Sequence, residues 1–484
     1  MLNVRFILKM LGKMLLLETI FMLVATGVAF LYQGDDFIPF LVSSGSMAGT
    51  GLLLSALGFR AEVRSGGRRE GLLIVSTIWC LFSFFGMLPF LLGGYVDTAA
   101  DAFFETMSGF TTTGATILPD IERMPHGILF WRSLLQWQGG IGMVVFTVAL
   151  LPIFGGVSSQ MFDAESTGVL HERFLPRITQ VAKRLWVVYL FLTFLVIGLL
   201  WWGPMDLFDA VNHGLATIST GGYSTKNSSI GYWHSAYVEY VVTIFMLIGA
   251  VNMTLLFFCF KGHFKRLLKD EELRWYLSMV GAATAATALW IFYQGYADGV
   301  EEAFRKSVFH VASLVTTSGF ATENYVPWGP FFWVISLILM FVCGCAGSTS
   351  GGLKVERAVI LTKILSNEFK KQTHPQAVIP VRMNGRVVSG DVVHRVLAFV
   401  FAYITLIVFS CLVLTLDGLG FVEAISAALT AISNVGPGLG AIGPANTFAD
   451  LPDTSKWFLS FLMMVGRLEI FTVLTVLMPG FWKQ

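Results

Sequence analysis

The chain has 484 residues, of which 55% are hydrophobic and 13% are charged, and its mean hydropathy is +0.71. Soluble domains carry about 25% charged residues, so this composition excludes a water-soluble globule and predicts an integral membrane protein. The formal net charge of +1 indicates neither nucleic acid nor another polyanion as a partner. The five cysteines lie mostly in apolar runs without a CxxC pair, which predicts small core residues rather than a disulfide or metal site.

Ten apolar runs are candidate membrane spans, because a helix needs about 20 apolar residues to cross the hydrocarbon. In chain order they are Leu8 to Tyr32, Phe37 to Phe59, Gly71 to Leu92, Phe130 to Ile153, Leu185 to Trp202, Ala236 to Phe260, Trp275 to Tyr296, Phe331 to Cys345, Val396 to Leu416 and Trp457 to Met478. Between several of them lie shorter apolar segments followed by Gly, Thr and Ser. These segments are too short to cross the membrane, and we expect them to be re-entrant pore helices. The predicted fold is therefore all-α, with ten transmembrane helices and four re-entrant pore helices.

The basic residues test this layout, because Lys and Arg near span ends favour the cytoplasm. Most of the 32 Lys and Arg fall in connections that ten spans place on the cytoplasmic side. One miscounted span would invert this bias in every later connection, so we expect both termini to be cytoplasmic. The longest such connection runs from Lys354 to Arg395 and, with the segment from Ser158 to Arg184, is the expected docking surface for a cytoplasmic regulator.

A short pattern around a glycine occurs four times, at spacings of about 100 residues, which is far too long for a solenoid repeat. We align the copies on Gly114, Gly221, Gly319 and Gly436. The predicted filter residues are Thr111, Thr112, Thr113, Gly114, Ser219, Thr220, Gly221, Thr317, Ser318, Gly319, Asn434, Val435 and Gly436. Glycine lets a filter strand turn its carbonyls toward an ion, and Thr and Ser add hydroxyl oxygens. Four copies between full spans favour a cation pore over close packing of helices by small residues.

Each predicted pore helix begins with an acidic residue followed by alanine, at Asp101, Asp209, Glu302 and Glu423. An acidic residue suits the positive N-terminal end of a helix. The opposite, partially negative end then points at the glycine cluster, where it would stabilise a cation. The third acidic residue lies about one helical turn further from its glycine than the others do.

The repeat divides the chain into five parts. Two N-terminal transmembrane helices occupy residues 1–69. The four pore repeats are expected over 70–183, 184–273, 274–393 and 394–484, and the third contains an intramembrane loop over 343–353.

Two features are candidates for a gate. Arg467 is a basic residue deep in an apolar run, where an unpaired charge costs several kcal/mol, so we expect it to face the pore and to find its partner on another segment. The second feature is a Gly- and Ser-rich interruption of an inner helix, with the candidate residues Gly344, Gly347, Ser348, Thr349, Ser350, Gly351 and Gly352. Glycine costs about 1 kcal/mol inside a helix, so a broken loop is expected there. The alternatives are a structural salt bridge for Arg467 and a static packing kink for the loop.

Several motifs of this sequence resemble those of a known family. The four filter loops, together with Gln138-Gly139-Gly140-Ile141-Gly142, Gly347 to Lys354 and Gly466-Arg467-Leu468-Glu469, resemble the TrkH subunits of bacterial Trk potassium uptake systems, whose broader relatives are the Ktr and plant HKT transporters. The resemblance implies uptake of K⁺ as the transported ion, bound at the filter residues, without a covalently bound cofactor. It also implies an inner-membrane homodimer, with one pore per subunit, on a cytoplasmic TrkA-type ring that binds ATP/ADP or NAD(H).

The resemblance also bears on selectivity. Family members that favour Na⁺ often carry serine at the first filter glycine, and Gly114 at this position favours K⁺ over Na⁺. The four loops differ from one another and from the TVGYG filter of tetrameric K⁺ channels, so we expect looser selectivity than in those channels.

Two other classes of function compete with a channel-like pore. A symporter that couples K⁺ to H⁺ or Na⁺ needs titratable groups near the midplane, and the candidates are His213 and His310 in pore helices. An intramembrane enzyme is suggested only superficially by Ser348 and Ser350, which lack an evident general base, so we expect no enzyme.

Overall fold

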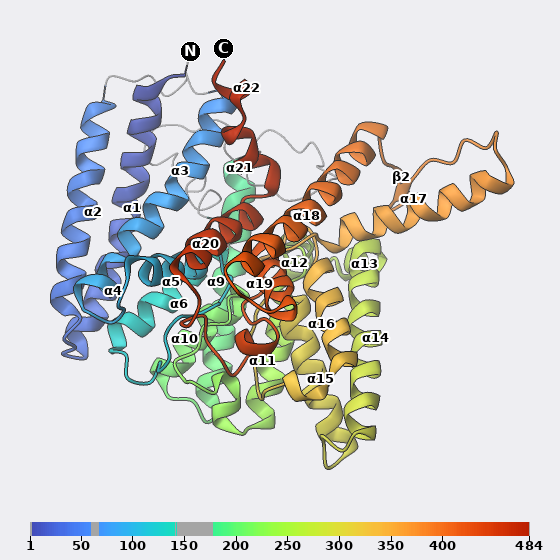
Figure 1. The fold of residues 1–484 in the computed structure, drawn as a ribbon, viewed down its shortest axis with the longest axis horizontal. Coiled ribbons are helices and arrows are strands. Elements are labelled where there is room, and N and C mark those ends of the chain that lie inside the picture. The colour runs from blue at the N-terminus through green and yellow to red at the C-terminus, as the bar shows by residue number, and fades with distance from the viewer. Residues whose placement is uncertain (1, 60–66, 141, 143–177, 484) are drawn as a thin grey trace.

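The computed structural model describes residues 2–59, 67–140, 142 and 178–483. The chain begins with two long helices that pack against each other along their length, α1 (Val4–Leu31) and α2 (Phe37–Leu57). The start of α1 and the C-terminal helix lie at the same end of the molecule (Figure 1). This arrangement agrees with the expectation that both termini are on one side of a membrane.

Four groups of helices follow. The first group contains α3 (Arg68–Gly86), α4 (Leu88–Leu92), α5 (Ala99–Phe110) and α6 (His126–Gly140). The second contains α9 (Ile178–Trp202), α10 (Leu207–Ile218), η3 (Ser229–Trp233), α11 (Ala236–Gly249), α12 (Met253–Phe260) and α13 (Phe264–Lys269). The third contains α14 (Glu271–Tyr293), α15 (Val300–Val315), η4 (Val326–Trp328), α16 (Pro330–Val342), α17 (Val355–Thr373), β1 (Arg382–Met383) and β2 (Arg386–Val387). The fourth contains α18 (Gly390–Leu416), α19 (Phe421–Ser433), η5 (Gly440–Ile442), α20 (Asp453–Arg467), α21 (Ile470–Leu477) and α22 (Pro479–Trp482).

The short helices α5, α10, α15 and α19 form the buried centre. Each ends directly before one of the four glycine clusters, and nearly all residues in their second halves are buried. The predicted acidic residues Asp101, Asp209, Glu302 and Glu423 all occupy the third position of their helices. There they face the positive end of the helix dipole, as expected.

The inner helices α6, α11, α16 and α20 close the arrangement into a ring. Each contacts the short helix of its own group and that of the next, so α6 joins α5 to α10, α11 joins α10 to α15, α16 joins α15 to α19, and α20 joins α19 back to α5. The outer helices α3, α9, α14 and α18 pack on the short helix of their own group. The four glycine clusters are therefore brought around one axis.

The predicted spans are recovered in part. Within the described residues, six helical segments are long and apolar enough to cross a membrane: Val4–Leu31, Phe37–Leu57, Arg69–Leu92, Ala182–Trp202, Glu271–Tyr293 and Gly390–Leu416. Two further runs, Ala236 to Phe260 and Trp457 to Met478, contain bends of 106° and 117° instead of one straight helix. The helix α16 has only 13 residues. The count of ten crossings and four re-entrant helices stays a prediction.

Two predicted segments lie partly outside the described residues. The run from Phe130 to Ile153 begins in α6 and continues into residues 143–177, which also contain most of the expected docking segment from Ser158 to Arg184. A small exception to the all-α prediction is the antiparallel pair β1 and β2, which projects with α17 away from the helical bundle (Figure 1). Its turn is Asn384-Gly385, both with positive φ, a strong hairpin signal that the sequence analysis did not use.

Candidate ion pathway

The four glycine loops share one unusual backbone conformation. A glycine in each loop has positive φ, namely Gly114 (81°), Gly222 (82°), Gly319 (75°) and Gly436 (108°). Two residues earlier in each loop stands a non-glycine residue in the left-handed region, at Thr112 (55°), Thr220 (53°), Thr317 (59°) and Asn434 (58°). Non-glycine residues in the left-handed region are uncommon. Their recurrence at the same position of all four loops shows that this turn is a shared feature of the repeats.

This pattern corrects the predicted alignment of the second loop. The counterpart of Gly114 is Gly222, whereas Gly221 occupies the position before it and matches Thr113 of the first loop. The signal that would have found Gly222 is the aromatic residue after the glycine, because Tyr223 follows Gly222 as Phe320 follows Gly319.

The four positive-φ glycines, here called the glycine ring, are in mutual contact around a closed circle. A Cβ atom added to Gly114 would lie 2.1 Å from the Gly221 carbonyl oxygen, one on Gly222 1.8 Å from that of Ser318, one on Gly319 2.3 Å from that of Val435, and one on Gly436 2.7 Å from that of Thr113. Each glycine thus abuts the carbonyl that precedes the ring glycine of the next repeat, and the fourth repeat returns to the first. A side chain at any ring position would displace backbone of the neighbouring loop.

Oxygen atoms dominate the surroundings of the ring. Asn434 Nδ2 donates to Thr113 Oγ1 (3.0 Å) and thereby joins the fourth loop to the first. Thr112 Oγ1 and Asn434 Oδ1 are buried oxygens with no hydrogen-bond partner among the described residues. Carbonyl and hydroxyl oxygens of this kind suit a monovalent cation.

Two further predicted filter hydroxyls lie at the ends of short helices, and a third, Ser318 Oγ, lies 2.9 Å from Thr316 Oγ1. Thr111 Oγ1 donates to the Met107 carbonyl (2.7 Å) and lies 2.8 Å from Thr113 Oγ1. Ser219 Oγ donates to the Leu215 carbonyl (2.8 Å). The Thr111 and Ser219 hydroxyls therefore satisfy carbonyls in the last helical turn.

The predicted broken loop is present, because α16 ends at Val342 and α17 begins at Val355. It packs directly against the filter loops. The Gly351 N–H donates to Thr317 Oγ1 (2.9 Å), and Thr220 Oγ1 donates to Thr349 Oγ1 (3.2 Å). A Cβ atom on Gly351 would lie 2.0 Å from the Ser433 carbonyl oxygen. The loop therefore touches the filter segments of the second, third and fourth repeats.

The other predicted loop residues shape the loop itself. Gly347 and Gly352 both have a φ of 70°, and Ser348 Oγ lies 2.9 Å from Ser350 Oγ. A Cβ atom on Gly344 would lie 2.4 Å from Ser350 Oγ. The loop is therefore folded tightly on itself.

The bend between α11 and α12 packs against this loop and was not predicted from the sequence. The Cys345 N–H donates to the Ala250 carbonyl (2.9 Å), and the Met253 N–H donates to the Gly347 carbonyl (3.0 Å). The loop and the bend thus satisfy the backbone groups that each leaves unpaired. Asn252, whose side chain caps α12, was the available sequence signal.

Arg467 binds carbonyls on two other segments, as predicted. Its Nη1 donates to the Thr349 carbonyl in the loop (2.8 Å), while Nη2 donates to the carbonyls of Gly139 and Gly140 (3.1 Å for Gly140) at the end of α6. The end of a helix carries unpaired carbonyls and partial negative charge, which suits a guanidinium. Arg467 therefore fastens the loop to an inner helix of another repeat.

Two further anchors of the loop were not predicted. Glu272 Oε1 accepts from the Ala346 N–H (2.6 Å) in the loop and from the Glu356 N–H (3.1 Å) in the first turn of α17. On the other side, Arg357 Nη2 pairs with Glu469 (2.8 Å), which stands at the sharp turn between α20 and α21 with a φ of 61°. The acidic start of α14 suggested only helix capping, so the sequence offered no distinctive signal for this role of Glu272.

One basic residue near the start of α15, Lys306, occupies a position of inverted charge. Lys306 stands thirteen residues before the ring glycine of the third repeat. At the same position the other repeats have Asp101, Asp209 and Glu423. Lys306 pairs with Glu323 (2.9 Å), just as Asp209 pairs with Lys226 (3.4 Å), with the charges exchanged.

Comparison with known proteins identifies the family. The family model TrkH, described as a cation transport protein, matches residues 56–481. The chain is 37% identical to the Trk system potassium uptake protein TrkH of Escherichia coli K12, over 88% of each chain, and 34% identical to TrkH of Halomonas elongata over the full length of both. It superimposes on the crystal structure of the potassium transporter TrkH from Vibrio parahaemolyticus with a TM-score of 0.90, 35% identity and full coverage of both chains. The chain, a multi-pass membrane protein, therefore belongs to the TrkH family of cation transport proteins.

Proposed function

We propose that this chain takes up K⁺ across the cell inner membrane through a gated, channel-like pore whose filter is the glycine ring. The observation that carries the proposal is the closed circle of contacts among the four loops, in which each ring glycine lies against a carbonyl oxygen of the next loop. The curated relatives are named potassium uptake proteins, which supports K⁺ as the transported ion.

The proposed K⁺ ligands are the oxygens of the four filter segments, with Gly222 added to the predicted residues. Selectivity for K⁺ over Na⁺ requires that these oxygens hold positions suited to the larger ion. The tight contact of each ring glycine with the next repeat supports such a fixed geometry.

The gate in this proposal consists of Arg467 and the loop from Gly344 to Gly352. The loop contacts the filter through Thr317 and Thr220, and Arg467 holds it there through Thr349. A positive guanidinium beside the path repels a cation, and release of the loop would open the path.

We also propose that the chain forms a homodimer on a cytoplasmic TrkA-type ring that binds ATP/ADP or NAD(H). The relatives are named as parts of a Trk system, which implies further components. The projecting α17 and its hairpin supply an exposed surface, and the α17 C-terminal end carries Lys370 and Lys371 (Figure 1). The division into 1–69, 70–183, 184–273, 274–393 and 394–484 belongs to this proposal as its architecture.

The test is K⁺ flux into liposomes that contain the purified protein, with Na⁺ as competitor. Gly114→Ser should admit relatively more Na⁺, because its Cβ meets the Gly221 carbonyl, whereas Arg467→Ala should raise K⁺ flux. Gly281→Ala on α14 is the control, because no atom lies within 4 Å of its added Cβ. Unchanged flux and selectivity in both variants would refute the pore assignment. Strict dependence of K⁺ uptake on a proton or sodium gradient at fixed voltage would instead favour the alternative, a K⁺/H⁺ or K⁺/Na⁺ symporter.

A further inference from the structure

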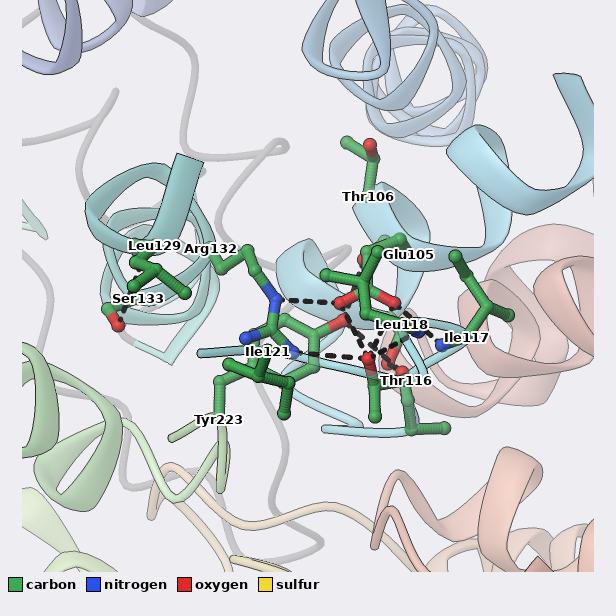
Figure 2. Close-up of polar contacts among 12 residues, drawn as sticks. Glu105, Thr106, Thr116, Ile117, Leu118, Ile121, Leu129, Arg132, Ser133 and Tyr223 are labelled. Carbon is green, nitrogen blue, oxygen red and sulfur yellow. Dashed lines mark hydrogen bonds and ion pairs between the residues drawn. The ribbon is translucent and has the colours of Figure 1, made fainter. Parts of the chain in front are cut away.

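A buried ion pair lies behind the first two filter loops (Figure 2). Glu105 on α5 and Arg132 on α6 approach to 2.7 Å between Oε1 and Nε, and their side chains are 0% and 1% exposed. Charges this deeply buried are costly unless they are fully paired and hydrogen-bonded. Both members of this pair make further hydrogen bonds.

The carboxylate holds the strand that leaves the first ring glycine. Glu105 Oε2 accepts from the Ile117 N–H (2.9 Å) and from Thr116 Oγ1 (3.0 Å). Thr116 lies two residues beyond Gly114, so this part of the first loop is fixed directly to the pore helix behind it.

The guanidinium extends the same network to the second loop. Arg132 Nη1 donates to the Ser224 carbonyl (3.1 Å), and its Cζ lies 4.1 Å from the centre of the Tyr223 ring. The Tyr223 hydroxyl donates to the backbone carbonyl of Glu105 (2.8 Å). Figure 2 shows these groups converging between α5 and α6. The strands that leave Gly114 and Gly222 are thus joined through one ion pair.

The equivalent positions in the other repeats carry different chemistry. Nine residues before the ring glycine stand Glu105, His213, His310 and Ala427 in the four repeats. His213 Nε2 lies 2.9 Å from Ser224 Oγ, and its ring stacks on Phe320 of the third loop. Glu105 is thus the one acidic residue at this position of the repeat.

We propose that Glu105 and Arg132 are positioning residues that set the selectivity of the pore by fixing the first and second filter loops relative to each other. The inference rests on the proposed filter function of the glycine ring. A filter discriminates between K⁺ and Na⁺ only while its oxygens keep their spacing. Among the described residues, the side-chain hydrogen bonds of the ion pair to the two loops end at Thr116, Ile117 and Ser224 rather than at a predicted filter residue. Loss of the pair therefore loosens the spacing of the loops without removing an ion ligand.

The experiment measures K⁺ and Na⁺ uptake by purified variants in liposomes. Glu105→Gln, which leaves the guanidinium unpaired, should lower the ratio of K⁺ to Na⁺ uptake about tenfold, equivalent to about 1.4 kcal/mol of discrimination. Tyr223→Phe keeps the ion pair and removes only the hydroxyl, which donates to the backbone carbonyls of Glu105 (2.8 Å) and Ala115 (3.2 Å), so it should lower the ratio by a smaller factor. The second variant carries the test alone if Glu105→Gln does not fold.

The matched control is Asp101→Asn on the same helix. Asp101 is also well buried, but its partners lie away from the segments that leave the ring, because Thr98 stands at the start of α5 and Lys456 (2.6 Å) stands on α20. This variant should keep the wild-type uptake ratio. A wild-type ratio in Glu105→Gln and Tyr223→Phe, together with a changed ratio in Gly222→Ala, would overturn this inference alone. A wild-type ratio in all three would overturn the proposed filter as well.

Discussion

Three threonines in the glycine loops are held in a conformation that their side chains disfavour. Thr112, Thr220 and Thr317 have left-handed backbones, at a cost of order 1–3 kcal/mol each, and such strain persists only where surrounding contacts impose it. The fourth loop has Asn434 there, a residue type that tolerates this region better. Each strained residue stands between the end of a pore helix and a ring glycine, where the chain must turn sharply. The strain is thus a consequence of the sharp turn that each glycine loop makes.

Substitution of Gly222 tests the corrected alignment at the residue scale. Gly222→Ala places a Cβ 1.8 Å from the Ser318 backbone oxygen at a φ of 82°, so the second and third loops must move apart. We expect at least about a tenfold loss in the ratio of K⁺ to Na⁺ uptake. In Gly221→Ala the Cβ instead meets the Gln136 side chain, so the loss should be smaller. A larger loss in Gly221→Ala would restore the original alignment.

At the scale of elements, the sequence predicts the helices better than the bends between them. The acidic first turns, the four short helices before the glycine loops and the break after Val342 follow from local composition, and the structure has all three. The bend after Gly249 was not predicted, because its local signal, the capping Asn252, stands in an otherwise apolar run. Its stability depends on loop residues about 100 positions away, which is a tertiary effect. The turn at Leu468 also depends on a tertiary contact, the ion pair between Glu469 at the turn and Arg357 of α17.

The anchor at Glu272 gives an element-scale prediction. Glu272→Ala leaves the Ala346 and Glu356 N–H groups without their acceptor, and each unsatisfied buried donor costs about 1–3 kcal/mol. The loop should therefore leave its closed position more often, and resting K⁺ flux should rise several-fold. The neighbouring Glu271→Ala is the control, because Glu271 binds Lys363 of α17 and Asn384 of the hairpin rather than the loop. Equal flux in the two variants would argue against Glu272 as an anchor.

At the scale of the molecule, the ring is built by one chain whose repeats have diverged in charge. The contact between Gly436 and Thr113 closes the circle across more than 300 residues of sequence, and Asn434 reinforces it. The four repeats keep the same backbone turns, yet Lys306 replaces an acidic residue and Glu105 has no acidic counterpart. The backbone of the four loops is therefore close to fourfold symmetric, whereas the side chains behind the loops differ between the repeats. Such asymmetry agrees with the expected looser selectivity.

The orientation of the whole chain is testable along one helix. The helix α14 has 23 residues, so its two ends lie about 34 Å apart, enough to cross the hydrocarbon. The hairpin docks at the first end, because Glu271 accepts from the Asn384 N–H (3.0 Å), and Gln294 stands at the other end. If the hairpin is cytoplasmic, an impermeant thiol reagent added outside intact cells should label Gln294→Cys and spare Val387→Cys, which is 57% exposed on the hairpin.

The five native cysteines require two controls in this experiment. The first control is the unsubstituted chain, whose labelling gives the background from the native cysteines. The second is the same labelling in everted membrane vesicles, where Val387→Cys should be labelled and Gln294→Cys spared. Labelling of Val387→Cys from outside intact cells would place the hairpin and α17 outside the cell. A cytoplasmic ring could then not dock on them, and the regulatory part of the proposal would fail while the glycine ring, which does not depend on orientation, would stand.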